Sequence, residues 1–262
     1  MDLGIEGKSA LVLAASGGLG FAIARALAAE GANVMLTARS EDKLAERTAE
    51  IEAAGRGRAE WIAADLADPE TPARLAAAME ARMGGADILV NNTGGPPPGR
   101  MVDAAPEVVA AQFQAMVLSV MKVTLAVLPH MRAVGWGRIL TVASSGVVQP
   151  IPNLGISNAM RSSLVGWSKS LAGDLAGEGI TVNMLLPGRI HTARTDQLDA
   201  NAAERSGKTV EEVRAASAAT IPAGRYGRVE EFGAVAAFLC SAPASYVTGG
   251  MVRCDGGMIR SV

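Results

Sequence analysis

A cluster of glycines near the amino terminus could bind phosphate groups. The segment SGGLG (residues 16–20) lies between an apolar run (9–15) and the start of an amphipathic stretch (19–32). Glycines at the start of a helix let the backbone approach a pyrophosphate, which then lies against the positive end of the helix. A strand-to-helix turn can also need glycine for its shape alone, so the surrounding fold decides between the two interpretations. The predicted phosphate-binding residues are Ser16, Gly17, Gly18, Leu19 and Gly20.

The elements that would position this loop alternate along the whole chain. Short apolar runs, typical of strands buried on both faces, alternate with longer amphipathic stretches that are typical of helices. This alternation predicts an α/β fold, a single domain over residues 1–262 with one doubly wound parallel sheet of about seven strands and helices on both faces. The predicted strands are 9–15, 33–39, 59–66, 86–92, 137–145, 179–188 and 250–257, and the predicted helices are 19–32, 41–55, 69–83, 106–131, 155–177 and 229–241.

One segment breaks the pattern. Residues 189–225 are polar and irregular, with a short helix that begins at the capping box T-V-E-E of Thr209. A long insertion after a late strand of a doubly wound sheet commonly lies over the ligand crevice. We therefore expect 189–225 to be a substrate-loop insertion.

Several motifs resemble those of the short-chain dehydrogenase/reductase family, most closely members similar to β-ketoacyl-acyl carrier protein reductase. The loop LAASGGLG (13–20) resembles the family's T-G-x-x-x-G-x-G, but Ala14 replaces the first glycine. A Cβ there resists a tight or left-handed turn at a cost of about 1 kcal/mol. The resemblance covers nearly the entire chain and implies a Rossmann-type fold. Its other motifs are DL (65–66), NNTG (91–94), PG (187–188) with Thr192, YVTGG (246–250) and DGG (255–257).

The resemblance also implies a nicotinamide dinucleotide cofactor. A carboxylate at the end of the second strand would bind the ribose hydroxyls of NAD and repel a 2′-phosphate. Ala38 stands at that position, and Arg39 offers a guanidinium to phosphate, so NADP (NADPH) is favoured over NAD. The implied cofactor-binding residues outside the glycine loop are Arg39, Asp65, Leu66, Asn91, Thr93, Gly94, Arg161, Pro187, Gly188, Ile190 and Thr192.

The family's catalytic residues are Asn, Ser, Tyr and Lys, and three of the four are replaced in this chain. GWSKSLA (166–172) resembles the family's G-L-T-K-S-L-A, and counting from it places Ser157 at the Tyr position and Arg161 at the Lys position. Ser144 keeps the Ser, whereas Met116 replaces the Asn. The predicted catalytic residues are Ser144, Ser157 and Arg161.

These replacements break the usual proton relay. A serine hydroxyl is a far weaker acid than a phenol, whose reference pKa is about 10. Arg161 stays protonated and can still hold the ribose hydroxyls, but Met116 orders no water. Loss of general acid catalysis typically costs about 10² to 10⁴ in rate. His191 is a weaker candidate for the proton donor.

Composition limits the partners. The formal net charge is −2 with scattered basic residues, so nucleic acid is not expected. The amino terminus lacks a basic signal-peptide region, and polar residues interrupt every stretch of eighteen, so we expect no membrane segment. Cys240 and Cys254 have neither metal-ligand nor disulfide spacing, which favours a reduced, cytoplasmic setting and no metal.

Three functions are compatible with these residues. The first is an NAD(P)(H)-dependent oxidoreductase, similar to 3-oxoacyl reductases, that acts on a carbonyl or alcohol of a small molecule. The second is a catalytically impaired homologue that binds a nucleotide or small molecule as a regulatory protein. The third is a structural protein without a nucleotide. The resemblance further implies a homotetramer or homodimer built on helices 106–131 and 155–177, and no motif specifies the substrate.

Overall fold

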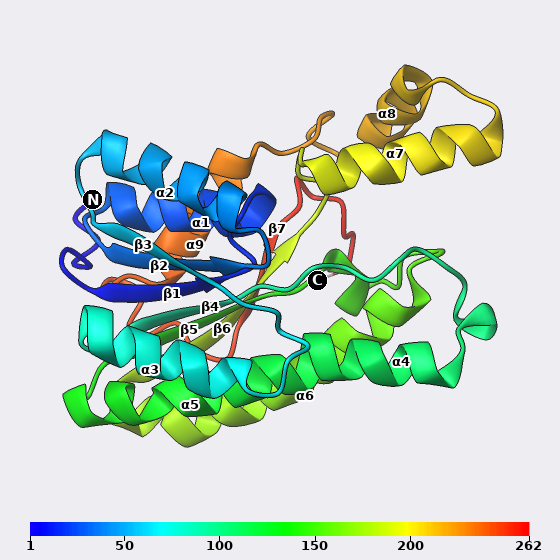
Figure 1. The fold of residues 1–262 in the computed structure, drawn as a ribbon. Helices are drawn as coiled ribbons and strands as arrows, with labels where there is room; N and C mark the ends of the chain where they lie inside the picture. The colour runs from blue at the N-terminus through cyan, green and yellow to red at the C-terminus, as the bar shows by residue number, and fades with distance from the viewer. Residues whose placement is uncertain (262) are drawn as a thin grey trace.

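Seven parallel strands form the centre of the molecule (Figure 1). In the computed structural model, which describes residues 1–261, the strand order is β3-β2-β1-β4-β5-β6-β7. The winding direction reverses between β1 and β4, so a crevice opens there at the carboxyl ends of the strands. The predicted doubly wound sheet is confirmed. The strands are β1 (Ser9–Leu13), β2 (Asn33–Ala38), β3 (Ala59–Ala63), β4 (Ile88–Asn91), β5 (Gly137–Val142), β6 (Ile180–Pro187) and β7 (Met251–Cys254).

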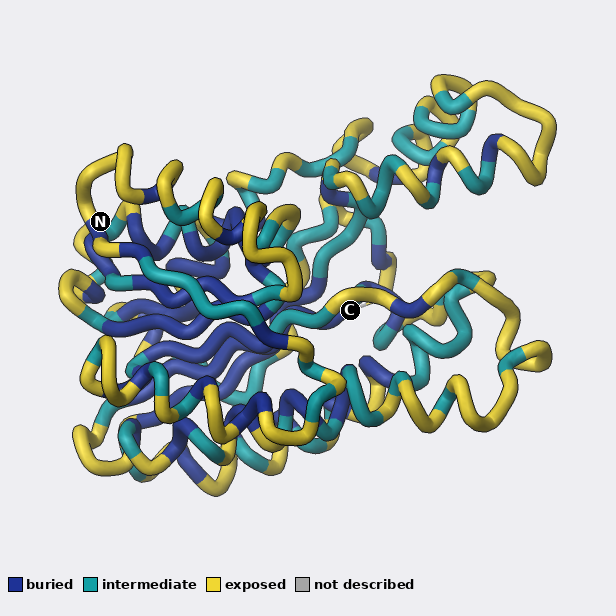
Figure 2. The backbone as a smooth tube through the Cα atoms, viewed as in Figure 1, coloured by how far each residue is buried: buried dark blue, intermediate teal, exposed yellow. Residues whose placement is uncertain are grey.

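Helices cover both faces of the sheet, because successive strand residues point to opposite sides. Val12 and Leu36 pack with α1, α2 and α9, whereas Leu11, Leu13 and Met35 pack with α3, α5 and α6. Figure 2 shows the strands as the most buried part of the chain. The helices are α1 (Gly18–Ala29), α2 (Glu41–Ala54), α3 (Thr71–Met83), α4 (Pro106–Phe113), α5 (Ser119–Val134), α6 (Gly155–Leu175), α7 (Ala193–Ser206), α8 (Val210–Ala219) and α9 (Val229–Leu239).

The first and last helices of the chain pack directly on each other. A Cβ at Gly233 of α9 would lie 2.7 Å from the carbonyl oxygen of Ala22 in α1. Only glycine at position 233 permits this approach. The packing of α1, near the start of the chain, therefore depends on α9, near its end.

The predicted helix 106–131 is interrupted. Residues Gln114–Leu118 form a π-helical turn between α4 and α5, and α5 continues to Val134. Such a turn holds one extra residue within the helix, and periodicity alone does not reveal it.

The prediction that residues 189–225 are irregular is wrong. Residues Ala193–Ser206 form α7, which Thr192 caps through reciprocal hydrogen bonds with Thr195. The helix was missed because its sequence is polar, with Leu198 as its one large apolar residue, and because it stands beyond the strand ends (Figure 1). The second helix, α8, begins at Thr209 with the expected capping box to Glu212.

The helical stretch Pro106–Val134 is long and apolar enough, by length and composition alone, to cross a membrane, contrary to the expectation from sequence. A core helix passes the same test. In this structure its residues Val123, Val127 and Met131 pack in the core between the sheet and its neighbouring helices.

Candidate functional site

The glycine loop joins β1 to the start of α1. Ala14 has a φ of 49° and Gly18 a φ of 55°, so both lie in the left-handed region. A Cβ at Gly20 would stand 2.5 Å from the carbonyl oxygen of Ala14, and therefore position 20 must be glycine. No side chain caps the first N–H groups of α1. The loop thus has the close backbone approach and the free helix end that a pyrophosphate needs.

The two asparagines after β4 have different structural roles. Asn91 is buried, and its Nδ2 donates to Thr124 Oγ1 of α5 at 2.9 Å. Asn92 Nδ2 donates to the carbonyl oxygen of Ala14 at 3.3 Å, which ties the glycine loop to the end of β4. The side chain of Asn91, an expected cofactor-binding residue, therefore faces the core, and Asn91 does not line the cavity described below.

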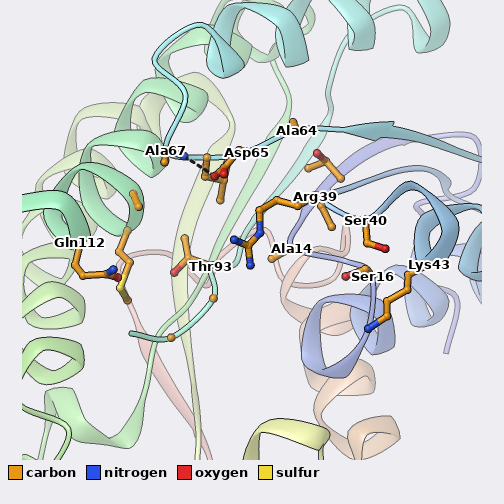
Figure 3. Close-up of a pocket in the computed structure, with 17 residues that line it drawn as sticks. Ala14, Ser16, Arg39, Ser40, Lys43, Ala64, Asp65, Ala67, Thr93 and Gln112 are labelled. Atoms are coloured by element: carbon orange, nitrogen blue, oxygen red, sulfur yellow. Dashed lines mark hydrogen bonds between the residues drawn. The ribbon is translucent and has the colours of Figure 1, made fainter. Parts of the chain in front are cut away.

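A cavity of about 860 Å³ lies at the carboxyl ends of the first four strands (Figure 3). It runs from the end of β2, past the ends of β3 and β4, to the π-helical turn. This volume is typical of a ligand site. Six of the residues predicted to bind a cofactor line it: Ser16, Arg39, Asp65, Leu66, Thr93 and Gly94.

Basic side chains enter this cavity at the β2 end. Figure 3 shows Arg39 extending into the cavity and Lys43 beside Ser16. Within residues 1–261, neither Arg39 nor Lys43 has a carboxylate oxygen within 4.0 Å. Lys43, from the first turn of α2, was not predicted as a cavity residue.

Asp65 forms the side of the cavity after β3. Its Oδ1 accepts a hydrogen bond from the backbone N–H of Ala67 at 2.9 Å, and its carbonyl oxygen accepts one from Thr71 Oγ1 at 2.7 Å. These bonds fix the turn in which Asp65 and Leu66 face the cavity.

Arg161 projects from α6 toward the ends of β4 and β5. Its Nη1 donates to the carbonyl oxygen of Val142 at 3.0 Å, and its Nη2 to that of Thr93 at 3.4 Å. Only 9% of the residue is exposed. Burial, with a smaller contribution from the charge of Arg194, lowers the pKa of Arg161 to about 10, so the guanidinium remains charged at neutral pH.

Each of the two serines lies close in sequence to Arg161 or to a residue that Arg161 contacts. Ser144 follows β5, two residues after Val142, and its Oγ accepts a hydrogen bond from the N–H of Gly146 at 3.0 Å. Ser157 is half-buried in the first turn of α6, one helical turn before Arg161. Asn158 bonds both backbone groups of Ile151 and so fixes the loop between the two serines.

Met116 lies in the π-helical turn and lines the cavity. It is 3% exposed and packs with Ala143 and Met160. Its thioether is a weak acceptor and no donor, so this part of the cavity wall is apolar where the family's Asn was expected.

The segment after β6 closes the other side of the crevice. A Cβ at Gly188 would lie 2.6 Å from Cα of Asp255, and Ile190 is buried. Thr192 lies over the glycine loop, since its methyl group would be 3.8 Å from a Cβ at Gly18. Pro187 ends β6 and leads into this segment.

A buried carboxylate anchors α7. Asp199 is fully buried; its Oδ1 accepts a hydrogen bond from Arg189 Nη1 at 2.7 Å, and its Oδ2 accepts one from Tyr226 Oη at 3.0 Å. Arg214 of α8 lies 3.8 Å away. Sequence reasoning missed Asp199, because nothing in a polar segment marks one aspartate as buried.

His191 and the two tyrosines, whose side chains could also donate a proton, do not lie in the cavity. His191 is exposed, with Nε2 3.2 Å from Asp196 Oδ1. Tyr226 is bonded to Asp199, and Tyr246 is fully exposed beside Arg138, at the amino ends of β5 and β6. None of the three lines the cavity. Within residues 1–261, no group of three or more His, Cys, Asp or Glu side chains could hold a metal ion.

Comparison with known proteins identifies the family. Residues 13–259 match the family model described as enoyl-(acyl carrier protein) reductase. 3-Oxoacyl-(acyl-carrier-protein) reductase FabG of Salmonella typhimurium is 36% identical over 258 residues, which are 98% of this chain and 99% of that protein. The chain belongs to the short-chain dehydrogenase/reductase family. The predicted resemblance is therefore confirmed.

Solved structures of this family superpose on the whole short-chain reductase fold. L-Sorbose reductase of Gluconobacter frateurii, in complex with NADPH and L-sorbose, has a TM-score of 0.95 at 33% identity and covers all of both chains. YwfH, an NADPH-dependent reductase of bacilysin biosynthesis, has a TM-score of 0.93 at 30% identity, over 97% of this chain and 99% of that one. Both neighbours use NADPH.

Proposed function

We propose that this chain is an NADP(H)-dependent oxidoreductase that acts on a carbonyl or alcohol group of a small molecule, similar to 3-oxoacyl reductases. The cavity at the strand ends carries this proposal, because Arg39 and Lys43 line it at one end, and Thr93 in its wall accepts a hydrogen bond from Arg161. Two reductases with the same fold support it as well, since YwfH is NADPH-dependent and L-sorbose reductase binds NADPH.

The positive groups of the cavity indicate where the phosphates of the cofactor would bind. Arg39 and Lys43 would bind the 2′-phosphate, and the first N–H groups of α1 the pyrophosphate. Asp65 and Leu66 would flank the adenine, and Gly94, Ile190 and Thr192 would enclose the nicotinamide end. When bound, reduced nicotinamide supplies the hydride.

The catalytic part of the site would use fewer of the family's usual catalytic side chains. The Ser144 hydroxyl would polarise the substrate oxygen. Arg161 would hold the ribose and stabilise negative charge as it develops on that oxygen, since a buried guanidinium acts at low local dielectric. The proton would come from Ser157, from bound water or from the substrate.

The first test is a titration of the purified protein with NADPH and NADH, followed by energy transfer from tryptophan to reduced nicotinamide. We expect saturable binding with NADPH preferred, and a preference that shrinks at least about tenfold in Arg39→Met. Lys208→Met, an exposed lysine outside the cavity, is the control with the same loss of charge. No binding of either nucleotide at millimolar concentration would refute the oxidoreductase function.

Nucleotide binding without turnover of any carbonyl or alcohol would favour the alternative, a catalytically impaired homologue with a regulatory role. The feature that supports this alternative is a crevice with Ser157 and Arg161 in place of the family's acid and its lysine.

We also propose a cytoplasmic homotetramer, or a homodimer, built on α4 to α6. Val108, Phe113 and Leu125 of α4 and α5 are large apolar residues exposed on the single chain. Residues 189–225, as α7 and α8, would cover the substrate.

A further inference from the structure

Two arginines meet at the substrate end of the crevice, from opposite sides. Figure 1 shows α6 on one side of the strand ends and α7 on the other. Arg161 of α6 donates to the carbonyl oxygen of Thr93, and Arg194 of α7 donates through Nη2 to that of Pro96 at 2.8 Å. Both guanidiniums therefore bind the same short loop, three residues apart.

These two cations lack an acidic partner. Within residues 1–261, neither Arg161 nor Arg194 has a carboxylate oxygen within 4.0 Å. The aspartates of α7 are engaged elsewhere: Asp196 pairs with His191 and Arg214, and Asp199 pairs with Arg189. The two positive charges repel each other, and the charge of Arg194 contributes to the lowered pKa of the buried Arg161.

The cofactor does not supply the missing negative charge at this end. Its phosphates are expected at Arg39, at Lys43 and at the start of α1. The nicotinamide ring is neutral when reduced and positive when oxidised, so oxidation adds a third positive charge beside the two guanidiniums. Arg161 also uses only two, and Arg194 two, of the five N–H donors of a guanidinium.

We infer that the substrate carries a carboxylate, which Arg194 binds with support from Arg161, so that the enzyme acts on an oxo acid or hydroxy acid rather than on a neutral thioester. This inference rests on the proposed function for its reaction, but not for its binding site. Arg194 is the specificity-determining residue, because its head lies against the loop backbone: a methyl group at Gly95 would be 3.5 Å from its Nη2.

The binding test needs no turnover. The full-length protein, saturated with NADP⁺, is titrated by calorimetry with butyrate and with butyramide, its uncharged counterpart. We expect butyrate to bind at least about tenfold more tightly than butyramide, and Arg194→Met to abolish that difference. Arg194→Lys should keep part of it, since lysine keeps the charge but not the planar fork. Arg205→Met, an exposed arginine on the last turn of the same helix, should change nothing.

Turnover is then compared for straight-chain oxo acids and their methyl esters with NADPH. The acids should be preferred, and Arg194→Met should lower kcat/KM for acids at least about tenfold while esters change less than about twofold. Equal binding of butyrate and butyramide would overturn the inference. So would a loss of NADPH affinity in Arg194→Met with the preference for butyrate intact, because Arg194 would then serve the cofactor. Failure to bind NADPH at all is a separate result and refutes the proposed function.

Discussion

At the scale of single residues, the site combines a strained backbone at Ala14 with a serine, Ser157, at the position of the family's tyrosine acid. Ala14 adopts a left-handed backbone where glycine is the natural residue, and the turn keeps its shape because Asn92 holds the carbonyl of Ala14. The sequence predicted both the missing glycine and its cost, since the motif is local. It did not predict Lys43 or Arg194, whose roles depend on elements that meet only in the fold.

Replacing Ala14 with glycine should stabilise the protein. Removing the Cβ from a residue with a φ of 49° relieves strain of about 1 kcal/mol, partly offset by the greater freedom of glycine in the unfolded chain. We expect a small rise in the free energy of unfolding in urea, and equal or tighter NADPH binding. Ala15→Gly is the control: Ala15 is fully buried without a positive φ, so this change should destabilise. Destabilisation by Ala14→Gly would show that the turn is not strained.

The double substitution Ser157→Tyr with Arg161→Lys should restore a phenol acid and its lysine. We expect kcat/KM for carbonyl reduction to rise at least about tenfold, within the range of general acid catalysis. Arg161 reaches the two carbonyl oxygens with two separate nitrogens, which the single ammonium of lysine does not offer, so some stability should be lost. Ser157→Phe with Arg161→Lys supplies the ring without the hydroxyl. An equal gain from both double variants would exclude proton donation as its cause.

At the scale of elements, helices with an apolar stripe were predictable and α7 was not. Strands and the covering helices show the period of burial in their sequence, and their existence and order agree with the structure. α7 is held instead by polar bonds, from the Thr192 cap and from buried Asp199. The π-helical turn was also hidden, because it shifts the helix by one residue without changing its composition.

Asp199→Asn should loosen α7 and α8. The substitution removes the charge that Arg189 and Arg214 face, and we expect a loss of about 2 to 3 kcal/mol, since both arginines are partly exposed and can be resolvated. Amide hydrogen exchange in residues 193–219 should become faster and kcat/KM should fall. Glu204→Gln removes the same charge from an exposed position of α7 and should have little effect. Unchanged exchange in Asp199→Asn would show that other contacts hold the two helices.

At the scale of the whole molecule, the sheet and its layers follow from the sequence, whereas assembly does not. A periodic apolar pattern shows that a face is covered, but it does not distinguish the core from a neighbouring chain. Leu125 illustrates this, because it belongs to an apolar helix and yet is 59% exposed.

Leu125→Glu should weaken assembly. A charge in an apolar interface is desolvated without a partner, so light scattering after size exclusion should show a shift to smaller species with unchanged circular dichroism. Lys122→Gln, an exposed position on the neighbouring turn, changes the net charge by the same amount and should leave the assembly intact. An unchanged mass for Leu125→Glu would place the interface on other helices.

The contact between α1 and α9 has a consequence for how the chain is made. Ribosomes deliver α1 early, but Gly233, which lets α9 pack against it, emerges only when most of the protein has been synthesised. Until then α1 packs only on early elements such as β1 and β2, and the part of its surface that meets α9 has no cover. We therefore expect a chain cut short before α9 to leave apolar surface uncovered and to aggregate rather than to fold as a shortened enzyme.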